Sequence, residues 1–230
     1  MEEKPLGWEA WTVSRVYLLV EGQTEEAFVN ELMVGRYAAM GRYLYPVIVR
    51  TSSHHRGGVV SYAKIRPQIE LLCKQDGSAF VTTLFDLYGL PSDFPGKTDQ
   101  DYPIAANGEL KAEFLETRLA ADIAQANFIP NLLVHEFEAL LFTKIEAFEE
   151  WIDDDNALLP LRNIRCSTAP EDINDALQTA PSKRILKVMP SYQKTFHGPL
   201  IASGIGLDAI RAECPHFDNW LNKIENLPAT

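Results

Sequence analysis

The sequence has few cysteines, no long apolar run and no excess of basic residues. Its three cysteines, Cys73, Cys166 and Cys214, form no Cys-x-x-Cys pair. This argues against a disulfide framework or a structural zinc site and favours a reducing compartment. No stretch approaches about 18 consecutive apolar residues, and the acidic N-terminus lacks the basic and apolar regions of a signal peptide. We therefore expect a cytoplasmic protein that does not span a membrane.

Basic residues are outnumbered, with 21 Lys and Arg against 32 Asp and Glu, for a formal net charge of −11. The chain as a whole therefore supplies no general attraction to nucleic acid, and a phosphate-bearing partner must meet a local basic patch, a metal ion or another subunit. The sequence also lacks the G-x-x-x-x-G-K-[ST] motif and a G-x-G-x-x-G motif after a strand. These absences exclude a P-loop ATPase and disfavour a dinucleotide site.

The 230 residues are 46% apolar, enough for a sizeable core, and this composition excludes disordered, collagenous and coiled-coil classes. Apolar patterning predicts strands over 15–20, 45–50, 79–85 and 128–134, and helices over 24–33, 62–74 and 109–126. Strands joined by helical crossovers run parallel. The expected fold is α/β, a mainly parallel sheet of about four strands with helices on both faces.

The sequence also suggests a division of the chain into three parts. We interpret 1–14 as a leader, 15–155 as the α/β core and 156–230 as a helical elaboration packed on that core. Within the elaboration, helices are predicted to begin near 169 and to cover 205–211 and 217–227, and 181–184 reads as a basic loop. Residues 87–108, rich in Pro and Gly, predict a long loop, and loops of that length are often functional.

Acidic residues follow three of the four predicted strands. Glu21 follows the first, Asp86 the third, and Glu136 and Glu138 the fourth. Ligands of open parallel sheets bind at the carboxyl ends of the strands, where these side chains converge. Carboxylates repel one another unless a cation such as Mg²⁺ or Mn²⁺ joins them, which predicts a hard-metal site for phosphoryl chemistry. The alternative is that each acid caps a turn or helix, as we expect of Glu25 in the first turn of its helix.

Two of these motifs resemble the Toprim fold of topoisomerases, DnaG-type primases and overcoming-lysogenization-defect nucleases. In that fold an acid after the first strand and an Asp-rich motif after the third hold Mg²⁺. The resemblance implies that Glu21 and Asp86 bind Mg²⁺ or Mn²⁺. The chain departs from the usual Asp-x-Asp because Tyr88 stands at the second Asp position and cannot replace a carboxylate ligand.

The chain as a whole resembles an uncharacterised bacterial Toprim-like family, formally a domain of unknown function. Five ordered motifs within about residues 15–227 carry the likeness, at 20–28, 85–96, 135–142, 180–184 and 214–217. Families of this kind are often found beside ATPase genes in anti-phage defence loci. The resemblance therefore implies a nuclease or effector subunit that works with an ATPase partner.

Three further acids are candidates to complete the metal set in place of the missing Asp. Asp93 lies in the long loop, and Glu136 and Glu138 point the same way if the chain stays extended after the fourth strand. Of these two we prefer Glu138, because it opens a helix.

A small group of residues is predicted to contact phosphate, against the alternative of solvated surface. It comprises Ser182, Lys183, Arg184 and Lys194. Lys183 or Lys194 would stabilise the negative charge that develops on the phosphate during the reaction. His197 is a candidate for proton transfer, although a lone His is usually structural, and the Gly-containing loop at 54–58 is a weak candidate for holding a phosphate on its N–H groups.

The sequence thus predicts a metal-dependent phosphodiesterase of Toprim type, a nuclease acting on nucleic acid. Two alternatives remain open. The first is a non-catalytic sensor or adaptor that binds an ATPase through its C-terminal helices, which the missing Asp-x-Asp favours. The second is a phosphohydrolase of small nucleotides, which the acidic surface would not disfavour. The oligomeric state is not predicted.

Overall fold

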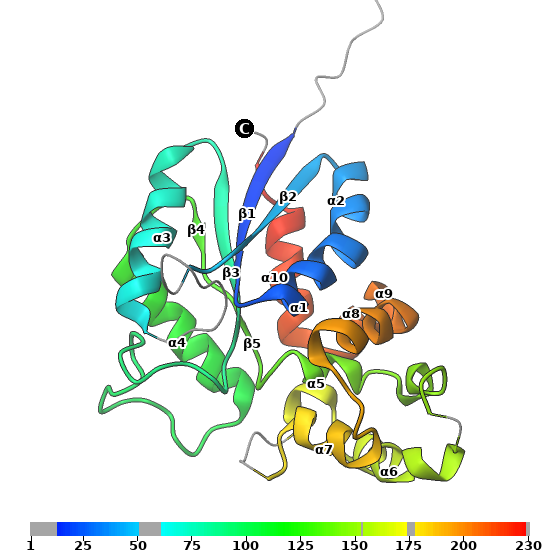
Figure 1. Ribbon diagram of the computed structural model, residues 1–230. Coiled ribbons are helices and arrows are strands. Elements are labelled where there is room, and N and C mark those ends of the chain that lie inside the picture. Colours follow the sequence, from blue (N-terminus) through cyan, green and yellow to red (C-terminus); the bar gives the residue numbers. More distant parts are fainter. Residues whose placement is uncertain (1–12, 51–60, 153, 174–177, 229–230) are drawn as a thin grey trace, which may run out of the picture.

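A parallel β-sheet forms the centre of the computed structural model, which describes residues 13–50, 61–152, 154–173 and 178–228 (Figure 1). The strands are β1 (Ser14–Val20), β2 (Arg42–Ile48), β3 (Phe80–Asp86), β4 (Phe128–Ile129) and β5 (Leu132–Leu133). Their order is β2-β1-β3-β4, and β5 also pairs with β3. Every pairing is parallel. The predicted α/β fold with a mainly parallel sheet is confirmed.

The fourth predicted strand is two short strands, because Pro130 and Asn131 interrupt it. Proline has no N–H to donate to the neighbouring strand. Thr83 of β3 fills the interruption, since its Oγ1 donates to the carbonyl of Asn131 at 2.7 Å and accepts from the Asn131 N–H at 3.1 Å. In the described part of the chain the sheet therefore has five strands where about four were expected.

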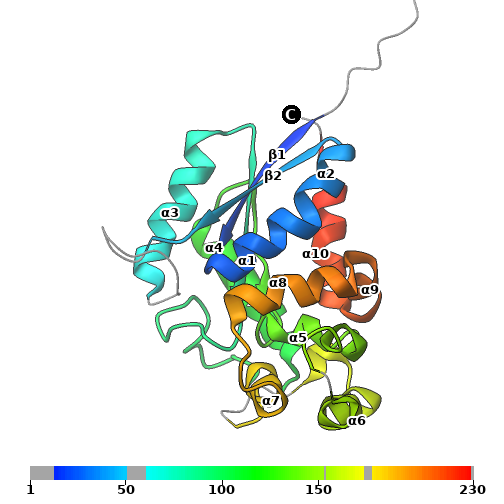
Figure 2. The same ribbon diagram turned by 45° about the vertical axis from the view of Figure 1, so that its right-hand side comes forward.

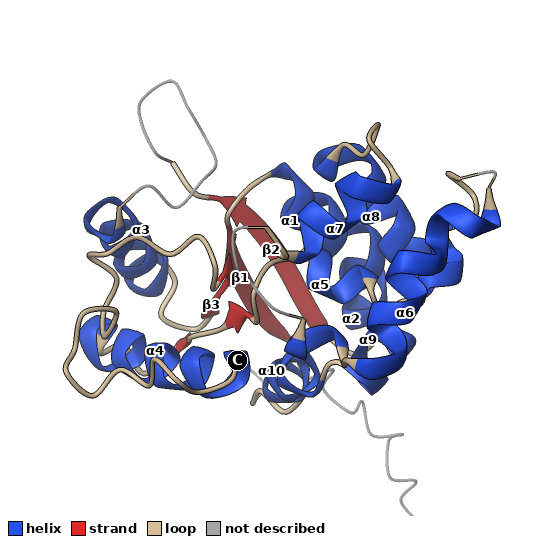
Figure 3. Ribbon diagram, turned by 90° about the horizontal axis from the view of Figure 1, so that it is seen from below, coloured by secondary structure: helices blue, strands red, loops and turns tan. Residues whose placement is uncertain are grey.

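Helices cover both faces of the sheet (Figure 3). On one face lie α3 (Tyr62–Gln75) and α4 (Gly108–Ile123), packed around Leu19 and Val81. On the other lie α1 (Gln23–Phe28), a π-helical stretch (Val29–Val34) and α2 (Gly35–Ala39). Side chains alternate between the faces along a strand, so Val16, Leu18 and Val20 of β1 belong to this second core.

The C-terminal part of the chain is helical, with α5 (Glu138–Leu141), α6 (Leu159–Ser167), α7 (Pro181–Val188), α8 (Lys194–Ile205), α9 (Leu207–Glu213) and α10 (Pro215–Glu225). Short 3-10 turns cover Ile145–Phe148, Asp155–Leu158 and Pro170–Asp172. The same hydrophobic cluster contains Leu18 of the sheet, Ile201 of α8 and Trp220 of α10, so these helices share a core with the strands. The domain boundary at residue 155 stays a prediction.

Two predictions for this region need correction or completion. Residues 181–184 were expected to form a loop, yet they make the first turn of α7, where Pro181 occupies the position that suits its fixed φ and missing N–H. The helix expected near residue 169 is only a 3-10 turn, Pro170–Asp172.

Among the described residues, no helix combines the length and apolar character needed to cross a membrane.

Candidate active site at the carboxyl edge of the sheet

Three acidic side chains meet where the strands end. Glu21 directly follows β1, Asp86 is the last residue of β3, and Glu138 opens α5 a few residues after β5. The Asp86 N–H donates to Glu21 Oε2 at 3.3 Å, and Asp86 Oδ1 accepts from the N–H of Phe137 at 2.9 Å. The main chain of one strand end therefore orients the carboxylate of the next.

The turn after β5 makes this arrangement possible. His135 has a φ of 67°, in the left-handed region that residues other than glycine rarely adopt. The turn directs the N–H of Phe137 onto Asp86 and starts α5 at Glu138, whose side chain is fully buried. Such conformations persist only where surrounding structure holds them, and they occur often at functional sites.

Glu25 is a fourth member of the cluster that the sequence reasoning did not assign. It lies in the first turn of α1, four residues after Glu21, and only 2% of its surface is exposed. Its place near the helix N-terminus agrees with the expected dipole interaction, but a solvated dipole partner would not be buried. The spacing Glu21-x-x-x-Glu25 across a strand end and a helix start was the available signal.

Lys194 lies at the centre of these carboxylates. Its Nζ is 3.0 Å from Asp86 Oδ2, 3.3 Å from Glu138 Oε2 and 3.5 Å from Glu25 Oε1. Lys194 begins α8, which packs against α1 and runs just below it in Figure 2. The sequence analysis chose Lys194 as a phosphate-facing cation, and the structure shows it paired with acids.

The position of Lys194 depends on close packing of α8. A Cβ at Gly198 would lie 3.0 Å from Cε1 of Phe137 and 3.2 Å from the Tyr192 hydroxyl oxygen, so only glycine lets the helix approach this closely. The Tyr192 hydroxyl also donates to Glu138 Oε1 at 3.3 Å. The residues that pack around α8 thus fix the position of the Lys194 ammonium and that of its partner Glu138.

Burial and mutual repulsion perturb the ionisation of the cluster. Burial, with the charges of Asp86 and Glu25, raises the pKa of Glu21 to about 7. Burial also raises the pKa of Glu138 to about 7, although Lys194 opposes the shift, and it raises the pKa of Glu25. Burial alone would lower the pKa of Lys194, but Asp86, Glu138 and Glu25 raise it well above its ordinary value. Lys194 therefore stays charged, whereas Glu21 and Glu138 are partly protonated near neutral pH.

The donor set fits a hard divalent cation. Glu25 Oε1 and Glu138 Oε2 are buried without a hydrogen-bond partner, and both face the ammonium of Lys194. With all four carboxylates ionised, as ligation of a cation requires, the cluster would carry three formal negative charges beyond the one positive charge of Lys194. Oxygen-only ligands at a crowded acidic centre are the set that Mg²⁺ and Mn²⁺ prefer. Glu21, Glu25, Asp86 and Glu138 would hold such an ion.

Comparison with known proteins identifies the family. Residues 20–225 match the family model described as Domain of unknown function (DUF4276). The chain belongs to this family. The matched range contains every residue of the cluster around Lys194, from Glu21 onward. No curated protein matches the chain in sequence.

Two solved structures resemble this DUF4276 chain distantly. The C-terminal region of the Burkholderia pseudomallei OLD protein is 16% identical, with a TM-score of 0.48, and the match covers 93% of this chain and 98% of that one. The C-terminal region of the Xanthomonas campestris pv. campestris OLD protein is 19% identical, with a TM-score of 0.41, over 91% and 97% of the two chains. Likeness at this level assigns no activity.

Two further acids proposed as ligands have other partners. The carboxylate of Glu136 accepts a hydrogen bond from the Ser182 N–H at the start of α7. Asp93 accepts from Ser61 Oγ and from the N–H groups of Tyr62 and Ala63, so it caps α3, and these hydrogen bonds lower its pKa. Neither acid forms an ion pair with Lys194, whose three acidic partners are Glu25, Asp86 and Glu138 among the residues described here.

Among the described residues, those proposed for phosphate binding on α7 form no ion pair with the acidic cluster around Lys194. The Ser182 N–H is occupied by Glu136, and Arg184 Nε donates to the carbonyl of Thr179. The side chain of Lys183 is exposed. A phosphate role for these residues stays a prediction.

His197 has a structural environment in this chain. Its Nδ1 accepts from the Gln193 N–H at 2.9 Å, which satisfies a donor at the start of α8, and its ring lies edge-on to Trp151 with centroids 4.9 Å apart. The loop at 54–58 lies outside the described residues.

Proposed function

We propose that this chain is a metal-dependent phosphodiesterase that cleaves nucleic acid at the cluster around Lys194. The observation that carries the proposal is a cluster of four carboxylates at the carboxyl edge of a parallel sheet. Glu25, Asp86 and Glu138 pair with the ammonium of Lys194, and Glu21 accepts a hydrogen bond from the Asp86 N–H. Burying several acidic groups together destabilises a fold unless a cation or another ligand compensates their charge, so such clusters are often functional sites. One or two Mg²⁺ or Mn²⁺ ions, when bound, would polarise the scissile phosphate and supply a hydroxide.

The chain's own residues would orient the site and hold charge. The Phe137 N–H fixes Asp86, and the Tyr192 hydroxyl fixes Glu138, so two ligands are placed before a cation arrives. Lys194 keeps 36% of its side chain exposed on a flexible stem. With a cation held by the acids, Lys194 would be free to turn toward solvent, and its ammonium would contact the phosphate oxygens of a substrate.

An ATPase partner and a role in anti-phage defence belong to the same proposal. The net charge of −11 supports a partner, because an acidic chain gains little from general attraction to a nucleic acid. A second protein would then complete the binding surface for the substrate.

A second candidate function is a non-catalytic adaptor that keeps the fold without the metal. The ion pairs of Lys194 favour it, since an ammonium already occupies the place where a cation would bind. Tyr88, at the position of the second Asp of Asp-x-Asp, favours it as well. An adaptor would have no measurable affinity for Mg²⁺ at this cluster.

The two candidates are separated by metal binding and cleavage in three forms of the protein. These are wild type, the double variant Glu21→Gln, Asp86→Asn, and the control Glu31→Gln, Glu150→Gln, which removes two exposed acids. Titration calorimetry with Mg²⁺ and Mn²⁺ measures affinity, and incubation with plasmid, single-stranded DNA, RNA and mononucleotides measures cleavage. We expect wild type and control to bind metal and cut polynucleotides, and the cluster variant to lose at least about a hundredfold in rate, about 2.7 kcal/mol of activation free energy.

Each other outcome has a defined meaning. Absence of metal binding at millimolar concentration, with and without an ATPase partner, would support the adaptor. Cleavage restricted to mononucleotides would replace the nuclease by a small-molecule phosphohydrolase. Equal cleavage by wild type and cluster variant would show that these carboxylates do not catalyse the cleavage.

A further inference from the structure

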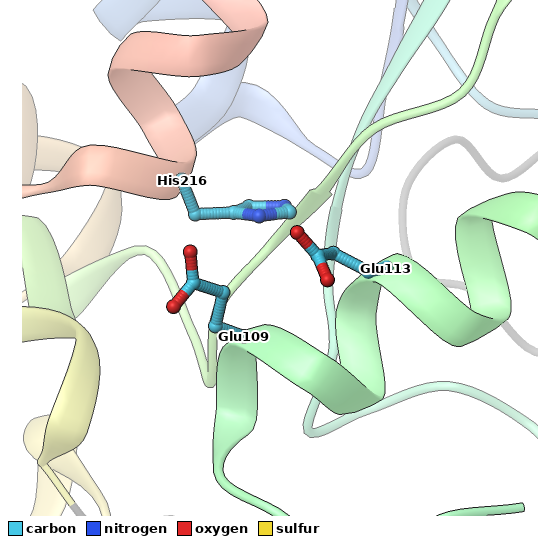
Figure 4. A group of neighbouring side chains, drawn as sticks. All are labelled: Glu109, Glu113 and His216. Atoms are coloured by element: carbon cyan, nitrogen blue, oxygen red, sulfur yellow. The ribbon is translucent and has the colours of Figure 1, made fainter.

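A second group of potential metal ligands lies between α4 and α10. Glu109 and Glu113 come from the first turns of α4, and His216 comes from the first turn of α10 (Figure 4). One ligand atom from each of the three residues lies within 4.8 Å of the other two. The two glutamates, four residues apart, project from the same side of α4 toward the imidazole (Figure 4). None of these residues belongs to the cluster around Lys194.

The imidazole of His216 is fixed in orientation from behind. Its Nε2 is 2.9 Å from Oε1 of Glu116, and that same oxygen accepts the Leu132 N–H at 2.8 Å. His216 and Glu116 are each only 6% exposed. A histidine that binds a metal through one nitrogen usually donates its other N–H to a carboxylate, which sets the tautomer and raises the basicity of the ligand nitrogen. Glu116 supplies that carboxylate and leaves Nδ1 for a cation.

The two glutamates are available for a ligand. The carboxylates of Glu109 and Glu113 form no ion pair or hydrogen bond with any residue that the structure describes. A cavity of about 270 Å³ is lined by Glu113 and His216 of this group, together with Glu116, Asn131, Asn219, Trp220 and Lys223. This volume accommodates an ion with its remaining water ligands.

We propose that Glu109, Glu113 and His216 form a binding site for a transition-metal dication, with Zn²⁺ as its preferred occupant. One imidazole with two carboxylates suits Zn²⁺ better than Mg²⁺, because imidazole nitrogen is a ligand for transition metals and Mg²⁺ prefers oxygen. Three protein ligands leave the fourth position to water from the cavity. The ion joins the start of α4 to the start of α10 and so clamps the C-terminal helix to the α/β core.

The opposing view is that the three residues form a charge cluster without metal. Burial lowers the pKa of His216, but the hydrogen bond and charge of Glu116, with Glu171 and Glu109, raise it above its ordinary value. A protonated imidazole would then neutralise the acids by itself. In that case zinc would neither bind nor stabilise the protein.

The test uses tag-free protein in which the first cluster is disabled by Glu21→Gln, Asp86→Asn. Zn²⁺ bound per chain is counted by equilibrium dialysis with elemental analysis, and the melting temperature is followed with and without Zn²⁺. We expect one equivalent of Zn²⁺ and a higher melting temperature. Adding Glu109→Gln, Glu113→Gln should abolish that equivalent, and adding the exposed pair Glu31→Gln, Glu150→Gln should not. All forms are checked for unchanged circular dichroism.

Glu116→Gln keeps an acceptor for Leu132 and removes the negative charge behind His216. We expect it to weaken Zn²⁺ binding by about 10–100-fold, as is usual for the carboxylate behind a metal-bound histidine. The proposal is overturned if no Zn²⁺ binds, or if binding survives loss of both Glu109 and Glu113. Both results are independent of whether the first cluster binds Mg²⁺ or cleaves a substrate.

Discussion

At the scale of single residues, Glu21 and Glu138 make the stability of the metal-free protein depend on pH. Each has a pKa raised from 4.5 to about 7, chiefly by burial. The folded state therefore binds more protons than the unfolded state between these values. The stabilisation that comes from these two protonated groups is fully present below about pH 4.5 and is lost as the pH rises through 7. Over that range the free energy of unfolding falls by up to about 1.4 kcal/mol per pH unit for each proton.

We expect the melting temperature of wild type in chelator to fall between about pH 5 and 8. Glu21→Gln removes one titrating group and its repulsion of Asp86 and Glu25, so its profile should be shallower and its stability at pH 8 higher. His216 titrates in the same direction, and comparison with the variant isolates the contribution of Glu21. Glu150→Gln should retain the wild-type slope. A flat wild-type profile would contradict the raised pKa values.

The residues of the site were predictable to different degrees. Glu21, Asp86 and Glu138 follow from one rule, that carboxyl ends of parallel strands meet at one edge. Glu25 did not follow, because an acid in a first helical turn interacts with the helix dipole whether or not it is buried. The pairing of Lys194 with Asp86, 108 residues away in sequence, required the packing of α8, which no local pattern encodes.

At the scale of elements, two glycines of α8 should respond oppositely to the same substitution. A Cβ at Gly198 would lie 3.0 Å from Phe137, whereas the nearest atom to a Cβ at Gly204 is 3.7 Å away on Ala147. We expect Gly198→Ala to destabilise the protein by about 1–3 kcal/mol through overpacking. Gly204→Ala should stabilise it by about 0.5–1 kcal/mol, since alanine loses less backbone entropy in a helix. Urea denaturation at one pH measures both.

Gly198→Ala should also weaken Mg²⁺ binding, because it displaces the helix that carries Lys194 and shifts Tyr192 against Glu138. Gly204→Ala, on the same helix, should leave that affinity unchanged. Equal stability changes at the two positions would show that α8 does not pack against Phe137 as closely as described.

Element boundaries were predictable where apolar periodicity is long and less so where proline intervenes. The helix at 62–74 matches α3 to within a residue, although Pro67 lies inside it. The strand at 128–134 divides at Pro130, whose missing N–H matters only once a neighbouring strand is in place. The predicted helix at 24–33 continues through a π-helical stretch to Ala39, and a widened turn of that kind leaves no mark in hydrophobic spacing.

At the scale of the whole molecule, charge determines how a nucleic acid can bind. The chain carries a formal charge of −11, and the cations proposed to meet phosphate are only Lys183, Arg184 and Lys194. Each phosphate neutralised by a protein cation contributes about −0.9 to the slope of log K against log salt on duplex DNA. Three contacts therefore predict a slope no steeper than about −3.

This slope is measurable by fluorescence anisotropy on a duplex oligonucleotide from about 50 to 200 mM KCl, with Ca²⁺ held constant to support binding without cleavage. Lys183→Met, Arg184→Met should reduce the slope by about 2, because it removes two of the three cations. The control Lys74→Met, Lys144→Met removes the same charge from exposed positions and should leave the slope unchanged. A wild-type slope of about −6 or steeper would require a phosphate track elsewhere on the chain. A shallow slope that steepens on adding an ATPase would place the missing cations on that partner.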